Sequence, residues 1–147
     1  MRTVRRLDLE DARLLIRAGV AKAAQMGVPQ CVAVTDESGI LIAFERMDGG
    51  KVSSVSIAID KAFTAAVARN ATSFYGKASH PDGPAWGINQ TNGGRFCVIG
   101  GGLPVVVDGV VVGGVGVSSG TAEQDEVVAR AAVEEFARAV EGATVEA

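Results

Sequence analysis

The fold is decided by one stretch, Leu103-Pro-Val-Val-Val-Asp-Gly-Val-Val-Val-Gly-Gly-Val-Gly-Val-Ser-Ser-Gly-Thr-Ala-Glu-Gln-Asp125. Its two valine-rich runs flank Asp108-Gly109, a dipeptide typical of tight turns between antiparallel strands. After the second run, Thr121 and Gln124 match the capping box that marks a helix N-terminus. We therefore predict two paired strands, residues 103–107 and 110–117, and a final helix that ends near Glu141.

The chain before this stretch predicts further helices and strands. Helical spacing of apolar residues predicts helices over 9–26 and 54–69, and two β-rich runs around a turn predict a hairpin with strands 31–35 and 40–45. We also expect a short helical piece over 71–77, a loop without clear period over 79–95, and a strand over 96–99. Hairpin-connected strands flanked by helices indicate an α+β fold with one antiparallel sheet.

Composition limits the class of protein. The chain has 147 residues, of which 48% are hydrophobic and 21% charged, and its net charge is −3. We expect a single packed domain over residues 1–147 that does not bind nucleic acid, because no basic surface is indicated. Acidic residues from Asp8 onward interrupt any apolar region, so we expect a cytoplasmic protein with no membrane partner. Cys31 and Cys97 lie in apolar runs and are expected to be buried thiols.

Six phrases along the chain carry a resemblance to a known family. They are Leu7–Ala12, Phe44–Gly49, Ile59–Ala62, Thr91–Arg95, Gly100–Pro104 and Gly116–Asp125. In this order they resemble the GlcG/HbpS family of haem-degrading or haem-binding proteins, and also the C-terminal domain of PduO. The resemblance implies a profilin-like, three-layer α+β fold whose five-stranded antiparallel sheet, in strand order 2-1-5-4-3, is flanked by helices. It also implies a homo-oligomer, either a dimer, a tetramer or an octamer.

The implied strand order brings three segments to one end of the sheet. Helix N-terminal amides and glycine-turn amides that point together form an anion-binding concavity, and an arginine beside them can bind a carboxylate through two parallel hydrogen bonds. We therefore predict a ligand site in which Asn92 and Arg95 take part only if their loop folds back or a neighbouring subunit supplies them. The predicted ligand-binding residues are Arg46, Asp48, Gly100, Gly101, Gly102, Ser118, Ser119, Gly120, Thr121, Asn92 and Arg95.

Each of these features also has a purely structural interpretation. Ser118 to Thr121 caps a helix whether or not it binds a ligand, and the triple glycine can serve only close packing. Arg46 can form an exposed ion pair, which contributes little to stability. Asn92 and Arg95 can simply fix the loop that carries them.

Three functions remain open from the sequence. The resemblance implies a small-ligand-binding protein for haem or a related tetrapyrrole, with His80, the only histidine, as the candidate iron ligand. Alternatively, an enzyme or accessory subunit holds a small hydroxy- or oxo-acid of a catabolic or biosynthetic pathway at Arg46, while Lys61, Glu123 or Asp125 moves a proton. The third is a structural oligomeric module without chemistry. Haem is the single candidate cofactor, and His80 is more simply a solvated loop histidine.

Overall fold

The computed structural model describes residues 1–145. The first half of this part contains a helix, a hairpin and a second helix, and the second half contains the glycine-rich hairpin and the last helix. In chain order the elements are α1 (Leu9–Met26), β1 (Cys31–Asp36), β2 (Leu41–Arg46), α2 (Ser54–Ala68), α3 (Thr72–Ala78), the 3-10 turns η1 (Ile88–Gln90) and η2 (Asn92–Gly94), β3 (Gly102–Val107), β4 (Val110–Ser118), α4 (Ala122–Ala139) and β5 (Ala143–Thr144).

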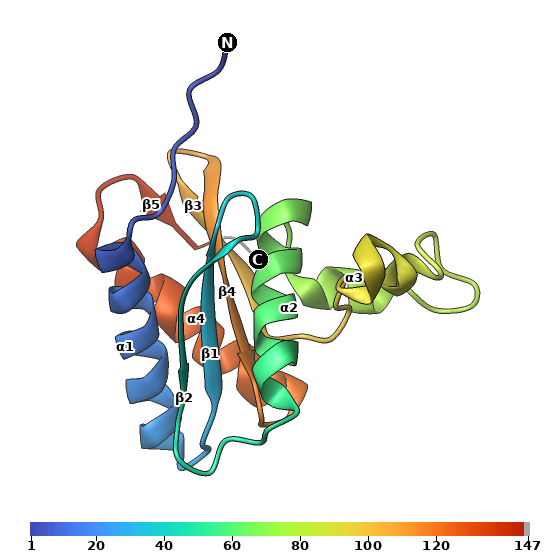
Figure 1. Ribbon diagram of the computed structural model, residues 1–147, viewed down its shortest axis with the longest axis horizontal. Helices are drawn as coiled ribbons and strands as arrows, with labels where there is room; N and C mark the ends of the chain where they lie inside the picture. Colours follow the sequence, from blue (N-terminus) through green and yellow to red (C-terminus); the bar gives the residue numbers. More distant parts are fainter. Residues whose placement is uncertain (146–147) are drawn as a thin grey trace.

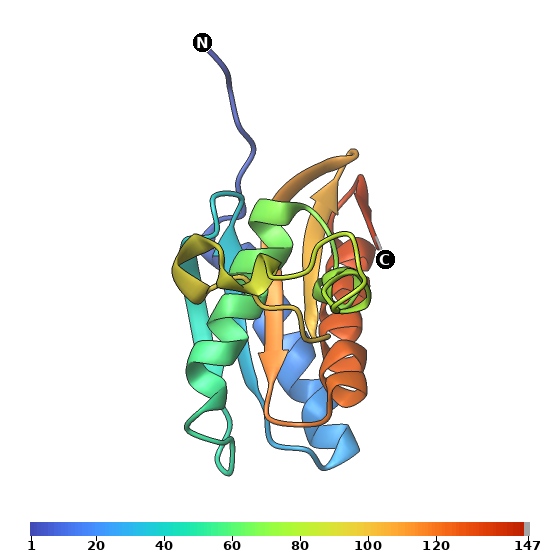
Figure 2. The same ribbon diagram turned by 90° about the vertical axis from the view of Figure 1, so that its right-hand side faces the viewer.

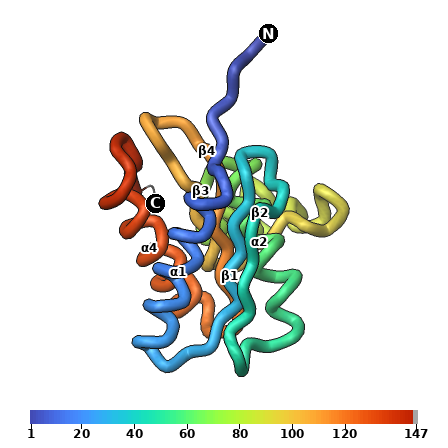
Figure 3. The backbone as a smooth tube through the Cα atoms, turned by 60° about the vertical axis from the view of Figure 1, so that its left-hand side comes forward, coloured from blue at the N-terminus to red at the C-terminus, as the bar shows by residue number. Residues whose placement is uncertain are grey.

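The strands form one antiparallel sheet in the order β2-β1-β4-β3-β5. Helices α1 and α4 lie side by side on one face of this sheet (Figures 1 and 3), and α2 covers the other face (Figure 2). The predicted α+β class, the three layers and the five-stranded sheet are confirmed.

The α1/α4 face holds the larger core. Leu15 of α1, Val32 of β1, Val115 of β4 and Phe136 of α4 are buried in one cluster between the sheet and these two helices. Full burial of such a side chain contributes about 1.5–3 kcal/mol relative to exposure, so this layer supplies most of the hydrophobic stabilisation. Both helices begin with a capping box, and the one at Thr121 and Gln124 is as the sequence predicted.

The α2 face is packed unusually closely, because small residues meet there. The helix presents Ala58, Ala62 and Ala66, and β4 presents Gly114 and Gly116. A Cβ atom added at Gly116 would overlap the carbonyl oxygen of Ala58, and one at Gly114 would overlap that of Ala62. The two glycines are therefore required by the close approach of the helix backbone to the strand.

The prediction of a strand over residues 96–99 is wrong. These residues are not in the sheet, and the position beside β3 is taken by the two-residue strand β5. Tertiary contacts hold the segment elsewhere: the Cys97 amide donates to Thr64 Oγ1 of α2 at 2.8 Å, and Phe96 stacks edge-on against Tyr75 with ring centroids 4.8 Å apart. Strand propensity is weak enough for such contacts to override it.

Residues 72–95 project from the body of the molecule as an arm that contains α3, η1 and η2 (Figure 1). The arm carries two exposed aromatic rings, Phe74 with a relative exposure of 52% and Trp86 with 63%. His80 is also exposed on this arm. Within residues 1–145 no helix has the length and apolar character that crossing a membrane requires.

Candidate functional site

The structure brings the three predicted segments together at one end of the sheet, which we call the rim. In the strand register Cys31 pairs with Arg46 on one side and with Ser118 on the other, and Gly102 pairs with Gly116. The end of β2, the end of β4 and the start of β3 therefore lie at the same level. The rim consists of Arg46, Asp48, Gly100 to Gly102 and Ser118 to Thr121, as the sequence predicted.

A buried ion pair lies directly beneath the rim. Lys61 Nζ donates to Asp125 Oδ2 and to the carbonyl oxygen of Val117, both at 2.9 Å. The two side chains are only 1% and 3% exposed. Gly101 covers the pair with a φ of 125°, and a Cβ atom there would lie 2.8 Å from Lys61 Nζ. Lys61 and Asp125 thus join α2, β4 and α4 at one point, and only glycine fits above them.

The amide groups of the rim are partly engaged by the protein itself. The amide of Gly120 donates to Asp125 Oδ1, and the amide of Thr121 donates to Gln124 Oε1, each at 2.9 Å. Ser119 has a φ of 116°, and its Oγ accepts a hydrogen bond from the amide of Lys51 at 3.0 Å. Consequently fewer of the rim amides are free to bind an anion than the sequence suggested.

Gln30 is a polar residue of this region that the sequence analysis missed. Its side chain is fully buried, and neither Nε2 nor Oε1 has a hydrogen-bond partner in the described part of the chain. A Cβ atom built on Gly120 would lie 2.9 Å from Gln30 Nε2, 2.8 Å from Gln124 Oε1 and 3.0 Å from Asp125 Oδ1. Native proteins rarely leave a buried amide unsatisfied, so this carboxamide is an unusual, tightly enclosed polar group beside the rim.

The other predicted residues lie in different environments. Arg46, Asp48 and Glu123 are exposed at or near the rim. Asn92 and Arg95 lie on the arm, away from the rim: Arg95 donates to Asp60 Oδ1 at 3.3 Å and packs over the Phe63 ring at 4.0 Å, which fixes the arm to α2. Their loop does not fold back to the site within one subunit.

The thiols and the histidine form no metal centre. Among residues 1–145 no three His, Cys, Asp or Glu side chains are grouped as metal ligands. Cys31 is buried, Cys97 is half-buried, and both are free thiols. Burial raises the pKa of both cysteines, so at neutral pH they are protonated and weakly nucleophilic.

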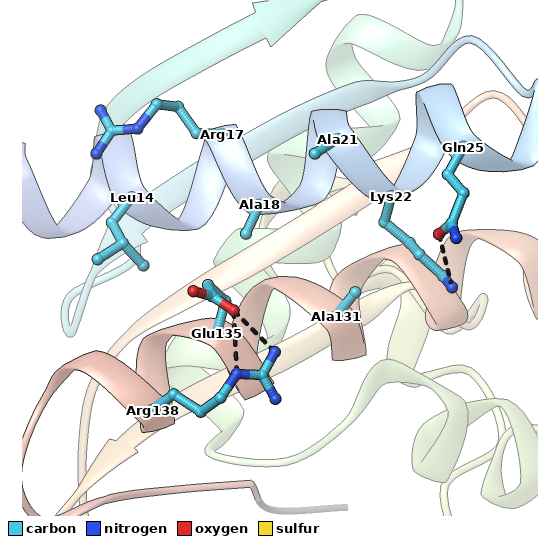
Figure 4. Close-up of a pocket in the computed structure, with 9 residues that line it drawn as sticks. All are labelled: Leu14, Arg17, Ala18, Ala21, Lys22, Gln25, Ala131, Glu135 and Arg138. Atoms are coloured by element: carbon cyan, nitrogen blue, oxygen red, sulfur yellow. Dashed lines mark hydrogen bonds and ion pairs between the residues drawn. The ribbon is translucent and has the colours of Figure 1, made fainter.

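A shallow groove of about 650 Å³ runs between α1 and α4 on the far side from α2 (Figure 4). Its floor is made of Leu14 and three alanines, Ala18, Ala21 and Ala131. Cationic side chains flank the floor: Lys22 contacts Gln25 Oε1 at 3.2 Å toward one end, and Arg138 pairs with Glu135 at 2.8 Å toward the other. The remaining lining residue is Arg17. This surface suits a flat apolar molecule that carries acidic groups.

Little in the sequence could have revealed Gln30 or the groove. Gln30 precedes β1 without any motif, and only the packing of Gly120 against it shows that its amide is enclosed. The groove depends on which two helices lie side by side, and helical periodicity does not specify that pairing.

Comparison with known proteins identifies relatives across nearly the whole chain. Residues 7–134 match the family described as haem degrading protein HbpS-like. An uncharacterised 15.0 kDa protein from the dhaT-dhaS intergenic region of Citrobacter freundii is 38% identical over 88% of this chain and 92% of its own length. The crystal structure of Klebsiella pneumoniae ORFY superimposes with a TM-score of 0.92 at 35% identity, covering 96% of this chain and 97% of that one.

A further crystal structure contains a ligand. It is the PduOC:haem complex, which superimposes with a TM-score of 0.85 at 32% identity and covers 88% of this chain and 94% of that one. The profilin-like arrangement of helices around the sheet is shared with these structures. By sequence and by fold, this chain belongs to the HbpS-like family.

Proposed function

We propose that this protein binds haem or a related tetrapyrrole. The observation that supports this most directly is the likeness to PduOC, which was crystallised as a haem complex. An apolar macrocycle with two carboxylates needs a flat apolar surface and neighbouring cations. The groove between α1 and α4 is a surface of that kind.

The groove offers an apolar floor for the ring and cations for its carboxylates, but no ligand for the iron. The alanine floor has the flat shape that a macrocycle needs, and Lys22 and Arg138 are placed to receive the propionates. None of the residues lining the groove is a histidine, cysteine, methionine or tyrosine, which are the usual haem ligands. Binding in one subunit would therefore depend on apolar contact and charge, with any iron ligand supplied by His80 of a neighbouring arm.

Self-association belongs to this proposal. Phe74 and Trp86 are exposed on the arm, and exposed aromatic rings are enriched in the interfaces between proteins. A homo-oligomer formed through the arm would bury both rings and would bring the His80 of one subunit toward the surface of another.

A hemin titration followed by absorbance tests the haem proposal. We expect a saturable Soret shift that the double variant Lys22→Glu/Arg138→Glu weakens by about tenfold or more, a difference of roughly 1.4 kcal/mol in binding free energy. The matched control is Lys51→Glu/Arg46→Glu, which makes the same charge change at the rim and should leave the affinity unchanged. His80→Ala should abolish the Soret shift if the arm supplies the iron ligand.

Two other results would contradict haem binding in the groove. Loss of binding in the rim double variant alone would move the haem to Arg46 and its neighbours. A non-saturating absorbance change, equal in all variants, would refute haem binding by this protein.

A second candidate function, binding of a small hydroxy- or oxo-acid at the rim, is favoured by Gln30. Its unpartnered carboxamide presents an acceptor beside a donor, and a hydroxy-acid presents a hydroxyl donor beside a carboxylate acceptor. Arg46 lies close to the backbone of Gln30, since a Cβ atom on Gly50 would lie 3.1 Å from Arg46 Cγ and 3.4 Å from the Gln30 main-chain carbonyl oxygen. Proton transfer by Lys61, Glu123 or Asp125 belongs to this candidate, although the first and last of these are already paired with each other.

Entry of such an acid requires Ser119 and Gly120, which follow the end of β4, to move aside. These two residues are held by hydrogen bonds to side chains, at Ser119 Oγ and at the Gly120 amide, and the backbone of Ser119 is in a sparsely populated conformation. Both features make local opening easier than in the regular elements.

Thermal unfolding in the presence of lactate or propionate tests this candidate. The two acids differ only in the hydroxyl group, so lactate should raise the Tm and propionate should raise it less. Gln30→Met and Arg46→Ala should each abolish the lactate effect. Gln30→Met should also raise the Tm of the free protein by about 3 °C, because it removes an unsatisfied buried amide. Gln90→Met is the control for the same substitution elsewhere in the chain. If lactate and propionate raise the Tm equally, or if Gln30→Met lowers the Tm while Gln90→Met leaves it unchanged, Gln30 has only a structural role.

A further inference from the structure

A second hollow lies at the end of the sheet opposite the rim. The N-terminal segment, the C-terminal end of α2 and the β3–β4 hairpin enclose it, and its volume is about 970 Å³. Three arginines from two distant segments, Arg2, Arg5 and Arg69, line it. We call this hollow the arginine cleft.

The carboxylates near the arginine cleft are already used. Asp108 pairs with Arg5 at 2.8 Å, and Glu37, which lines the cleft, accepts a hydrogen bond from Arg6 at 2.8 Å. The hydrogen bond from Arg6 lowers the pKa of Glu37 to about 2, so this carboxylate remains ionised and paired at neutral pH. Within residues 1–145 no carboxylate pairs with Arg2 or Arg69, which leaves an excess of positive charge at the cleft.

Arg69 is held in a backbone conformation that its residue type disfavours. It follows the last residue of α2 with a φ of 57°, in the left-handed region. Glycine or asparagine usually occupies this position after a helix, because their side chains tolerate it. A bulky residue in this conformation is a reason to look for a role of its side chain.

Apart from Thr3 and Asn70, the remaining wall of the cleft is apolar. Ala66 and Val67 contribute from α2, Val106 from β3, and Val110 and Val111 from β4. An apolar wall below uncompensated guanidinium groups is complementary to a molecule with an anionic head and an apolar body.

We propose that the arginine cleft binds a small amphipathic anion, a carboxylate or a phosphate carried on an apolar chain. The head contacts Arg69 and Arg2, and the chain lies along the valines of the β3–β4 hairpin. This inference is independent of haem binding in the α1–α4 groove, since the two surfaces share no residue.

Titration of the full chain with octanoate, octyl phosphate and octan-1-ol, followed by amide chemical shifts, tests the proposal. We expect saturable shifts at Val67, Val110 and Val111 with octanoate or octyl phosphate, and at least about tenfold weaker binding of the neutral alcohol. The stronger of the two anions identifies the head group.

Arg69→Gly separates the role of the side chain from that of the fold. It should weaken anion binding about tenfold, yet raise the Tm by about 3 °C because glycine tolerates the left-handed conformation. Arg69→Lys should retain most of the affinity, and Lys22→Glu/Arg138→Glu should retain all of it. Equal affinity for octan-1-ol and octanoate, unchanged binding in Arg69→Gly, or shifts confined to the α1–α4 groove would each overturn the proposal.

Discussion

Gly116→Ala is expected to destabilise the protein by about 3 kcal/mol or more, at the upper end of what overpacking of a core costs. The added methyl group would overlap the Ala58 carbonyl oxygen and the Ala62 amide nitrogen. Both atoms belong to the backbone of α2, so no side-chain rotation can relieve the overlap. The helix must move away from β4, which separates the alanine face of α2 from the sheet. Urea unfolding followed by circular dichroism measures the loss.

Gly19→Ala is the matched control for this substitution. Gly19 is also buried and also lies in a regular element, but the nearest atoms to a Cβ there belong to the side chains of Val32 and Val128, at 3.4 Å and 3.6 Å. Alanine is the better helix former by up to about 1 kcal/mol, so we expect Gly19→Ala to be neutral or stabilising. Equal losses in the two variants would show that the close helix–strand approach at Gly116 does not limit stability.

The sequence predicts best those parts of the fold in which several local signals agree. The helix over residues 9–26 was predicted with its observed bounds, because its apolar face, its Asp8 cap and its Gly27 end all agree. The Asp108-Gly109 hairpin was equally secure, since few other conformations suit that dipeptide. Local signals that agree with one another are reliable.

The failed predictions depend on contacts between distant parts of the chain. Residues 96–99 have the composition of a strand, yet Thr64 and Tyr75 hold them away from the sheet. The strand that replaces them, Ala143–Thr144, is too short to have any periodicity. A short stretch of the sequence therefore predicts neither the absence of a strand over residues 96–99 nor the presence of β5.

The candidate site likewise has one part that could be predicted from the sequence and one part that could not. The rim could be predicted, because strand order alone determines which loops share an end of the sheet. The burial of Lys61 and Asp125 could not, although both residues were singled out. Their pairing depends on the distance between the two helices, α2 and α4, and the ends of β3 and β4. The spacing of residues along the chain does not predict that distance.

Lys61→Met, which breaks the buried pair with Asp125, is expected to lower the free energy of unfolding by about 3–5 kcal/mol. The substitution leaves the Asp125 carboxylate buried with only the Gly120 amide as a partner, and it removes the donor to the Val117 carbonyl. An uncompensated buried charge is costly because the protein interior solvates it poorly. Against a total stability of about 5–15 kcal/mol, such a loss is a large fraction of the whole.

The double variant Lys61→Met/Asp125→Asn distinguishes charge from packing. It removes both charges but keeps an oxygen that accepts from the Gly120 amide, so much of the stability should return. Arg138→Met breaks the exposed pair with Glu135, whose side chains are 67% and 51% exposed, and should change stability by no more than about 1 kcal/mol. If the double variant is as unstable as Lys61→Met, the lysine acts through its packed alkyl chain and its bond to Val117. If stability returns, the loss in Lys61→Met came from the unpaired charge of buried Asp125, and the role of Lys61 in the fold is to neutralise that carboxylate.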